Sequence, residues 1–166
     1  MYSHILVPLD GSAWSEYALP HAIEFARVRN ARLLLLHVIE SPQMEAVVAA
    51  GPAVAASVPA SMILKETQEK EQLQANAYLK RLKAKLESKE GIRCVVLVDK
   101  GNPAQCIANA ADHFGVDLVI MTSHRRTVLT SLFHRELALD VLRRIKHPVL
   151  LVCPTEQQIE KDGHCV

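Results

Sequence analysis

The apolar positions of this chain follow two alternating periods. Short runs that are apolar on both faces, as buried parallel strands are, lie at residues 5–7, 33–39, 92–98, 117–121 and 148–153. Between these runs, apolar residues recur every three or four positions, which is the spacing of a helix that buries one face. Strand and helix therefore alternate throughout, and right-handed crossovers predict one doubly wound α/β domain with a five-stranded parallel sheet and helices on both faces.

Four helices are expected between the strands. Ser12 caps the first helix, and Asn102 caps the third, with Pro103 at its first helical position. The second helix is long, over residues 61–88, and the fourth runs over residues 129–145. The expected buried faces of the second and third helices are Ala75, Leu79, Leu82 and Leu86, and Ile107, Ala110, Ala111 and Phe114.

Two segments interrupt the alternation of strand and helix. Residues 41–60 are rich in Ala, Val and Pro and predict a long connection, a kind of segment that is often functional in compact domains. Residues 155–166 predict a polar C-terminal tail. The sequence thus predicts a single domain over residues 1–154, with a variable loop at 41–60.

Composition narrows the class of protein. The 166 residues carry nineteen Lys and Arg against eighteen Asp and Glu, a formal charge of +1. This balance excludes a strong global field that would attract nucleic acid or an anionic membrane. No apolar stretch approaches the roughly 20 residues of a membrane span, and the N-terminus lacks the features of a signal peptide. We therefore expect a cytoplasmic protein without a membrane partner.

The four cysteines predict neither a metal site nor a disulfide framework. None belongs to a Cys-x-x-Cys pair, and no nearby His completes a zinc pattern. Cys94 and Cys153 lie inside apolar runs and are expected in the core. Cys165 lies in the tail and is either an ordinary free thiol or a redox handle.

Polar residues that follow the strands form the candidate site, because ligands of such sheets bind beyond the carboxyl ends of the strands. Asp10 directly follows the first strand. Its carboxylate either accepts hydrogen bonds from a ribose or helps to hold a metal, or it orders the turn and caps the next helix. Val38 either presents its backbone to the same crevice or packs in the core. Residues 122–127, with two Arg and one His, suit an anion or form a solvated basic surface.

Three other protein classes lack their required motifs here. The first turn, Asp10-Gly11-Ser12-Ala13-Trp14, has no glycine-rich dinucleotide fingerprint, and no Gly-x-Ser-x-Gly hydrolase elbow occurs. A phospho-accepting receiver domain carries an acidic pair after its first strand and a Lys after its fifth. This chain has the single Asp10 and the sequence Val152-Cys153-Pro154 at those places. Dehydrogenase, hydrolase and receiver functions are therefore set aside.

Several segments in the right order resemble the universal stress protein family. The opening residues His4–Ser12 are similar to the first strand of the family and the turn that follows it. The similarity continues at residues 15–26, 34–38, 101–104, 117–121, 141–143 and 148–152, so that it spans about residues 2–154.

This resemblance implies a Rossmann-like fold, similar to the adenine nucleotide alpha hydrolases, in the strand order 3-2-1-4-5. It also implies a protein without catalytic residues or a metal. Members usually form homodimers, often by pairing their last strands, and such an isologous contact here would involve Val149, Leu150, Leu151 and Val152.

The resemblance implies an ATP site of which only half is retained. In many members a Gly-x-x-Gly, nine further residues and Gly-Ser or Gly-Thr surround the phosphates, because glycine lets the backbone approach them. This chain has Thr122 and Arg125 at the first two glycines, and Arg135 and Glu136 at the final pair. The candidate nucleotide contacts are Pro8, Leu9, Asp10, Val38, Met121, Thr122, Ser123, His124, Arg125, Arg135 and Glu136. The adenosine half is thus retained and the phosphate half is rewritten.

Three functions remain as hypotheses. The first is a non-catalytic stress-response homodimer that lacks standard ATP binding and contacts other proteins through the 41–60 loop. The second is an adenine-nucleotide switch, in which ATP or AMP orders residues 122–127. The third, a nucleic-acid binder using the basic last helix, is disfavoured because no aromatic residues interleave with its charges. No cofactor other than ATP or AMP is implied.

Overall fold

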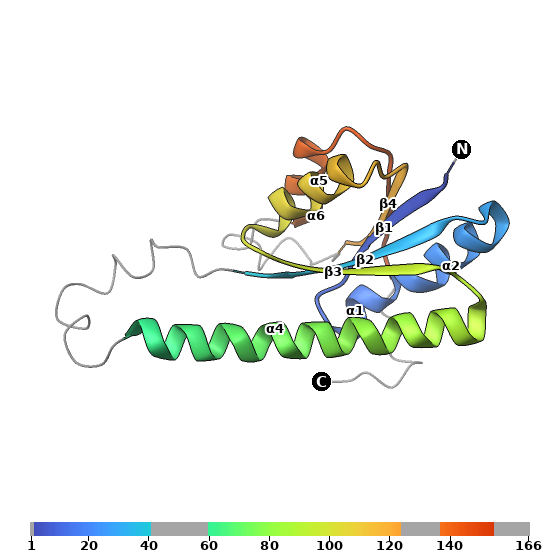
Figure 1. Cartoon of the computed structure of the whole chain (residues 1–166). Coiled ribbons are helices and arrows are strands. Elements are labelled where there is room, and N and C mark those ends of the chain that lie inside the picture. Colours follow the sequence, from blue (N-terminus) through green and yellow to red (C-terminus); the bar gives the residue numbers. More distant parts are fainter. Residues whose placement is uncertain (1, 41–59, 124–136, 155–166) are drawn as a thin grey trace.

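The computed structural model describes residues 2–40, 60–123 and 137–154, and of residues 60–67 it describes the helical backbone. Five strands form one parallel sheet in the order β3-β2-β1-β4-β5 (Figure 1). They are β1 (His4–Pro8), β2 (Arg32–Ile39), β3 (Cys94–Lys100), β4 (Leu118–Thr122) and β5 (Val149–Val152). The predicted fold class and the strand order implied by the resemblance are confirmed.

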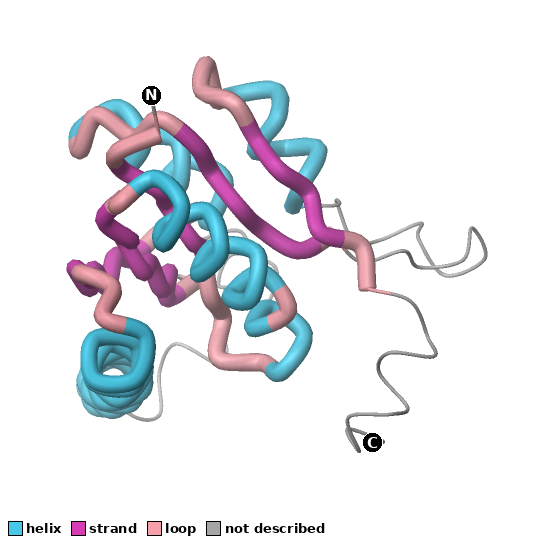
Figure 2. The backbone as a smooth tube through the Cα atoms, turned by 90° about the vertical axis from the view of Figure 1, so that its right-hand side faces the viewer, coloured by secondary structure: helices cyan, strands magenta, loops and turns pink. Residues whose placement is uncertain are grey.

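Helices cover both faces of the sheet. On one face lie α1 (Ala13–Glu16), α2 (Ala18–Arg29), α4 (Ala60–Lys85) and the π-helical turn η1 (Leu86–Glu90). On the other face lie α5 (Pro103–His113) and α6 (Leu137–Arg144). Figure 2, which looks along the axis of α4, shows the strands between these two groups of helices. The first predicted helix is divided at Tyr17 into α1 and α2.

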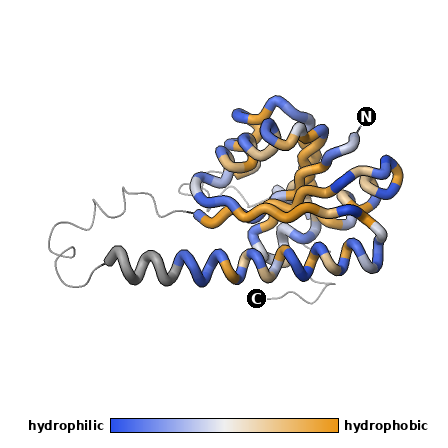
Figure 3. Tube along the Cα trace, viewed as in Figure 1, coloured by the Kyte–Doolittle hydropathy of each residue, from blue (hydrophilic) through white to orange (hydrophobic). Residues whose placement is uncertain are grey.

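The core consists of two apolar layers, one on each face of the sheet. Successive strand residues point to opposite faces, so β1 buries Ile5 and Val7 in one layer and Leu6 in the other. The central strands are therefore mostly apolar, whereas α4 alternates between polar and apolar residues (Figure 3), and its Leu79 and Leu82 pack on the sheet. The predicted stripe of Ala75, Leu79, Leu82 and Leu86 is buried.

The predicted helix caps are confirmed. The Ser12 hydroxyl accepts a hydrogen bond from the Ser15 N–H at 3.1 Å, at the start of α1. The Asn102 side chain accepts one from the Gln105 N–H at 3.0 Å, and Pro103 occupies the first position of α5. Each cap satisfies an N–H that the first turn of a helix leaves without a partner.

The third strand lies two residues further along the chain than predicted. Ile92 is buried but precedes the strand, because the chain leaves η1 through Ile92 before its pairing with β2 begins. The pairing starts at Leu33 opposite Cys94 and continues to Ile39 opposite Lys100. Burial of an apolar residue therefore marked the core and not the start of the strand.

Two residues expected in the core are exposed. Phe114 is 41% exposed, because it follows the last residue of α5 and packs edge-on against the exposed His113. Cys153 is exposed because it lies one residue beyond β5, whereas Cys94 is buried as predicted. The connection at 41–59, residues 129–136 of the predicted fourth helix, and the tail at 155–166 lie outside the described residues.

Candidate functional site

The crossovers change face between β1 and β4, which are neighbours at the centre of the sheet. The chain leaves β1 toward α1 and α2 on one face, and leaves β4 toward α6 on the other. At such a switch point the connections diverge and leave a crevice beyond the carboxyl ends of the two strands. The topology thus places Leu9 and Asp10, which follow β1, beside the described end of β4 at Thr122 and Ser123.

The described candidate residues differ in what they can present to a ligand. Leu9 and Met121 are almost completely buried, one in each apolar layer, so only their backbones are available. Pro8 and Val38 are half-buried, and Val38 packs against the layer that holds α5 and α6. Asp10 is exposed, and its side chain is therefore the most accessible of this group.

The Asp10 carboxylate is held by its own turn. Its Oδ1 accepts hydrogen bonds from the Ser12 N–H at 2.9 Å and from the Ser12 hydroxyl at 2.6 Å. Burial alone would raise the pKa of Asp10, but these hydrogen bonds outweigh it and the pKa lies below its usual value. The carboxylate is therefore ionised at neutral pH. Of the two roles weighed for Asp10, the structure describes the ordering of the turn, and it leaves Oδ2 outside these two hydrogen bonds.

The turn after β1 depends on Gly11 and Ser15. Gly11 has a φ of +84°, in the left-handed region that side chains with a Cβ resist. The Ser15 hydroxyl accepts a hydrogen bond from the Asp10 N–H at 3.3 Å and donates one to the Ser12 carbonyl at 2.9 Å. These contacts fold the chain from the end of β1 directly into α1.

A polar cluster that the sequence did not predict lies behind this turn. The Tyr78 hydroxyl of α4 donates a hydrogen bond to Glu16 Oε1 of α1 at 2.9 Å. Burial, and secondarily the Glu16 carboxylate, raise the pKa of Tyr78, so that it remains a donor. The His37 ring lies edge-on to the Tyr78 ring, with centroids 6.4 Å apart. The only signal in the sequence was a tyrosine beside the apolar stripe of a long helix.

The end of β4 is described only as far as Ser123. Thr122 is half-buried and pairs with Val152 of β5, and the Ser123 N–H donates to the Val152 carbonyl at 2.9 Å. His124, Arg125, Arg135 and Glu136 lie outside the described residues. The described part of the site therefore includes the residues expected to contact adenosine, together with the first position of the glycine motif.

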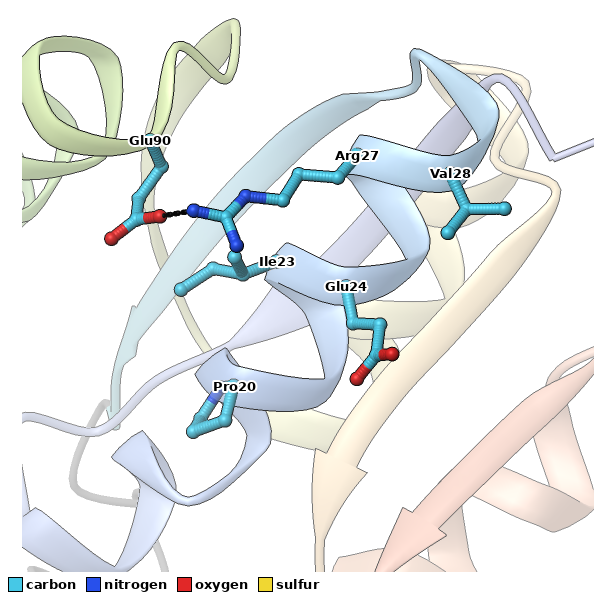
Figure 4. Close-up of a pocket in the computed structure, with 6 residues that line it drawn as sticks. All are labelled: Pro20, Ile23, Glu24, Arg27, Val28 and Glu90. Atoms are coloured by element: carbon cyan, nitrogen blue, oxygen red, sulfur yellow. Dashed lines mark hydrogen bonds and ion pairs between the residues drawn. The ribbon is translucent and has the colours of Figure 1, made fainter.

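A separate hollow lies between residues of α2 and η1 (Figure 4). It has a volume of about 570 Å³ and is lined by Pro20, Ile23, Glu24, Arg27, Val28 and Glu90. An ion pair between Arg27 and Glu90 joins α2 to η1 at its rim. None of the predicted site residues lines this hollow.

The residues proposed for dimer contact lie on one edge of the sheet. Val149, Leu150, Leu151 and Val152 are all half-buried, and within the described residues β5 pairs with β4 alone. Leu150 and Val152 pack toward the face of α2, and Val149 and Leu151 toward the face of α6.

Among the described residues, no group of three His, Cys, Asp or Glu side chains could hold a metal ion. The helices in the described ranges include none that is both long and apolar enough to cross a membrane.

Known proteins show the same fold and a related sequence. Universal stress protein MJ0577 of Methanocaldococcus jannaschii is 29% identical over 158 residues, which cover 92% of this chain and 95% of that protein. Its solved structure has a TM-score of 0.73 at 28% identity and covers 94% of this chain and 99% of its own.

Two more distant solved structures contain a nucleotide and share the fold. A universal stress protein in complex with cAMP has a TM-score of 0.62 at 18% identity, covering 93% of this chain and 98% of its own. A universal stress protein family protein of Arabidopsis thaliana with AMP bound has a TM-score of 0.56 at 13% identity, covering 94% of each chain.

The sheet order, the turn at Asp10 and these relatives agree with the match of the family model itself. That model, described as the universal stress protein family, matches residues 1–152 and so covers the described fold from its first strand to its last. This chain belongs to the universal stress protein family.

Proposed function

We propose that this chain is a non-catalytic stress-response protein of the cytoplasm, which acts through protein contacts and does not bind ATP in the standard way of its family. The observation that carries the proposal is Thr122. It stands where ATP-binding members have their first motif glycine, and it lies within β4, paired with Val152. Its Cβ and hydroxyl occupy space beside the strand end that a glycine leaves to phosphate oxygens.

The residues further along the motif support the same conclusion through charge. Arg125, Arg135 and Glu136 replace the remaining glycines and the serine. A carboxylate at position 136 disfavours a triphosphate, because like charges repel at short range. The two arginines suit a smaller or differently placed anion.

The test is the nucleotide content of the purified protein. We expect denatured protein to release no stoichiometric ATP, and calorimetric titration with ATP and magnesium to give neither binding nor hydrolysis. A matched gain-of-function variant restores the motif through Thr122→Gly, Arg125→Gly, Arg135→Gly and Glu136→Ser, and we expect it to acquire ATP binding. Tightly bound ATP in the unmodified protein contradicts the proposal.

The second candidate function is a switch that binds an adenine nucleotide with fewer phosphates. The observation that favours it is the ionised Asp10, whose Oδ2 lies outside the two hydrogen bonds from Ser12 and suits the hydroxyl donors of a ribose. The relatives solved with cAMP and with AMP support an adenosine site on this fold.

Titration with AMP, cAMP and adenosine tests this second candidate. Asp10→Asn should weaken any binding by about tenfold, the value of a hydrogen bond to a charged group. Asp117→Asn is the matched control, because Asp117 also accepts backbone N–H groups but lies at the opposite ends of the strands. The absence of heat and of thermal shift at millimolar ligand rejects the switch.

The proposed homodimer would form by antiparallel pairing of two β5 strands. Its support is the apolar, half-buried edge formed by Val149, Leu150, Leu151 and Val152. Position 151 lies near the two-fold axis of such a pair. The variant Leu151→Cys, made in a Cys153→Ser background, should therefore form an intermolecular disulfide on mild oxidation. Val28→Cys, on the exposed outer side of α2, should not. A protein that elutes as a monomer at micromolar concentration contradicts this assembly.

The proposed protein partners would contact the 41–60 loop. Deletion of this loop should then abolish capture of those partners without changing the oligomeric state.

A further inference from the structure

A hydrogen bond joins the longest helix to the shortest one. The Tyr78 hydroxyl donates to Glu16 Oε1 at 2.9 Å across a sequence separation of 62 residues. Glu16 is the last residue of α1, which has four residues. So short a helix has little stability of its own, because helix nucleation is costly, and its position therefore depends on contacts from outside.

Helix α1 in turn shapes the turn that carries Asp10. The Ser15 hydroxyl accepts a hydrogen bond from the Asp10 N–H, and the Ser12 hydroxyl accepts one from the Ser15 N–H. The Ser12 hydroxyl also donates to the Asp10 carboxylate at 2.6 Å. A displacement of α1 therefore reaches the carboxylate through two serine side chains.

Tyr78 is itself held firmly enough to act as an anchor. Its ring is half-buried and lies edge-on to His37 of β2. The next residue, Leu79, is completely buried in the apolar layer under the sheet, and Leu82 continues the same stripe. The helix α4 is thus fixed to the sheet, and the hydrogen bond from Tyr78 ties the end of α1 to it.

We propose that Tyr78 is a positioning residue for the candidate site: its hydroxyl holds α1 through Glu16, and α1 holds the Asp10 carboxylate toward the strand ends. The inference rests on the proposal that Asp10 faces a ligand. Its consequence can nevertheless be measured on the ligand-free protein, because the contacts that orient Asp10 are internal to the chain.

The test compares Tyr78→Phe with the unmodified protein by NMR. The variant loses the hydroxyl but keeps the ring beside His37. Hydrogen exchange at the Ser12 and Ser15 amides should accelerate by about five- to tenfold, which corresponds to the loss of one hydrogen bond. The titration midpoint of the Asp10 carboxyl should move upward, because the donors of Ser12 are held less firmly.

Two further variants separate positioning from packing. Tyr2 precedes β1, and its ring packs on Phe25. Tyr2→Phe also removes a phenol hydroxyl, but it should leave the titration midpoint of Asp10 unchanged. Glu16→Gln keeps the acceptor oxygen and removes the charge, so the titration midpoint of Asp10 should stay the same or move downward.

The proposal is overturned if Tyr78→Phe changes neither the titration midpoint of Asp10 nor the hydrogen exchange of the Ser15 amide. An upward shift of that midpoint in Glu16→Gln also overturns it. A failure to bind nucleotide leaves both readouts intact and thus counts only against the proposed switch.

Discussion

Truncation of Leu79 tests whether α4 is anchored by the stripe that packs on the sheet. The side chain is 0% exposed and lies in the same apolar layer as Leu33 and Leu35 of β2. Leu79→Ala removes about three carbon groups at about 0.8 kcal/mol each, and the cavity that remains adds to this loss. We expect the free energy of unfolding to fall by about 3–4 kcal/mol, within the range for such truncations. That is a large part of the roughly 5–15 kcal/mol of a whole domain.

The assay is urea unfolding followed by far-ultraviolet circular dichroism. With a slope of about 2 kcal/mol per molar urea, the midpoint should fall by about 1.5–2 M. Leu73→Ala is the matched control on the same helix, because Leu73 is 71% exposed, and its effect should stay within about 0.5 kcal/mol. Equal losses in the two variants, or a loss below about 1 kcal/mol for Leu79→Ala, refute the assigned face of α4.

Three further predictions follow from local contacts. Asn102→Ala removes the cap on the Gln105 N–H and should cost about 1 kcal/mol in thermal or urea unfolding, and no change would contradict the capping role. Burial, and secondarily Asp99, raise the pKa of Cys106 to about 11, so iodoacetamide at pH 8 should modify the exposed Cys153 before Cys106. Mass spectrometry checks this, and equal rates contradict it. Hydrogen bonds from the Ser3 and His4 N–H groups lower the pKa of Asp117. Its stabilisation therefore exists above about pH 4 and is lost as the pH falls through the folded-state pKa. Asp117→Asn should flatten the acid limb of a melting-temperature profile, and an unchanged limb would count against this contribution.

Much of the fold could be predicted because its signals are local. A strand that is apolar on both faces, such as Leu33–Ile39, requires cover on both sides, which only a parallel sheet between helices provides. The cap at Asn102 and the following proline fix the start of α5 within one residue. The errors at Phe114 and Cys153 arose at element ends, where the apolar pattern continues although the packing has stopped.

The candidate site could be predicted only in part. Asp10 was found because it directly follows a strand, and topology then places it beside the end of β4. The contact between Tyr78 and Glu16 joins residues 62 positions apart, and no periodicity within either helix indicates it. Such a contact depends on where two helices settle on the sheet, and therefore on packing that single-sequence patterns do not encode.

The position of β1 also has a consequence for synthesis of the chain. This strand is synthesised before the other four, yet it lies at the centre of the sheet. Leu118 of β4, which pairs with Ile5, follows it by more than a hundred residues. Closing a loop of that length costs about 4 kcal/mol in chain entropy. Until β4 has left the ribosome, one edge of a strand with three buried apolar residues stays open to other chains. Products released before residue 118 should therefore aggregate or be degraded, and only chains synthesised past β4 can pass cellular quality control.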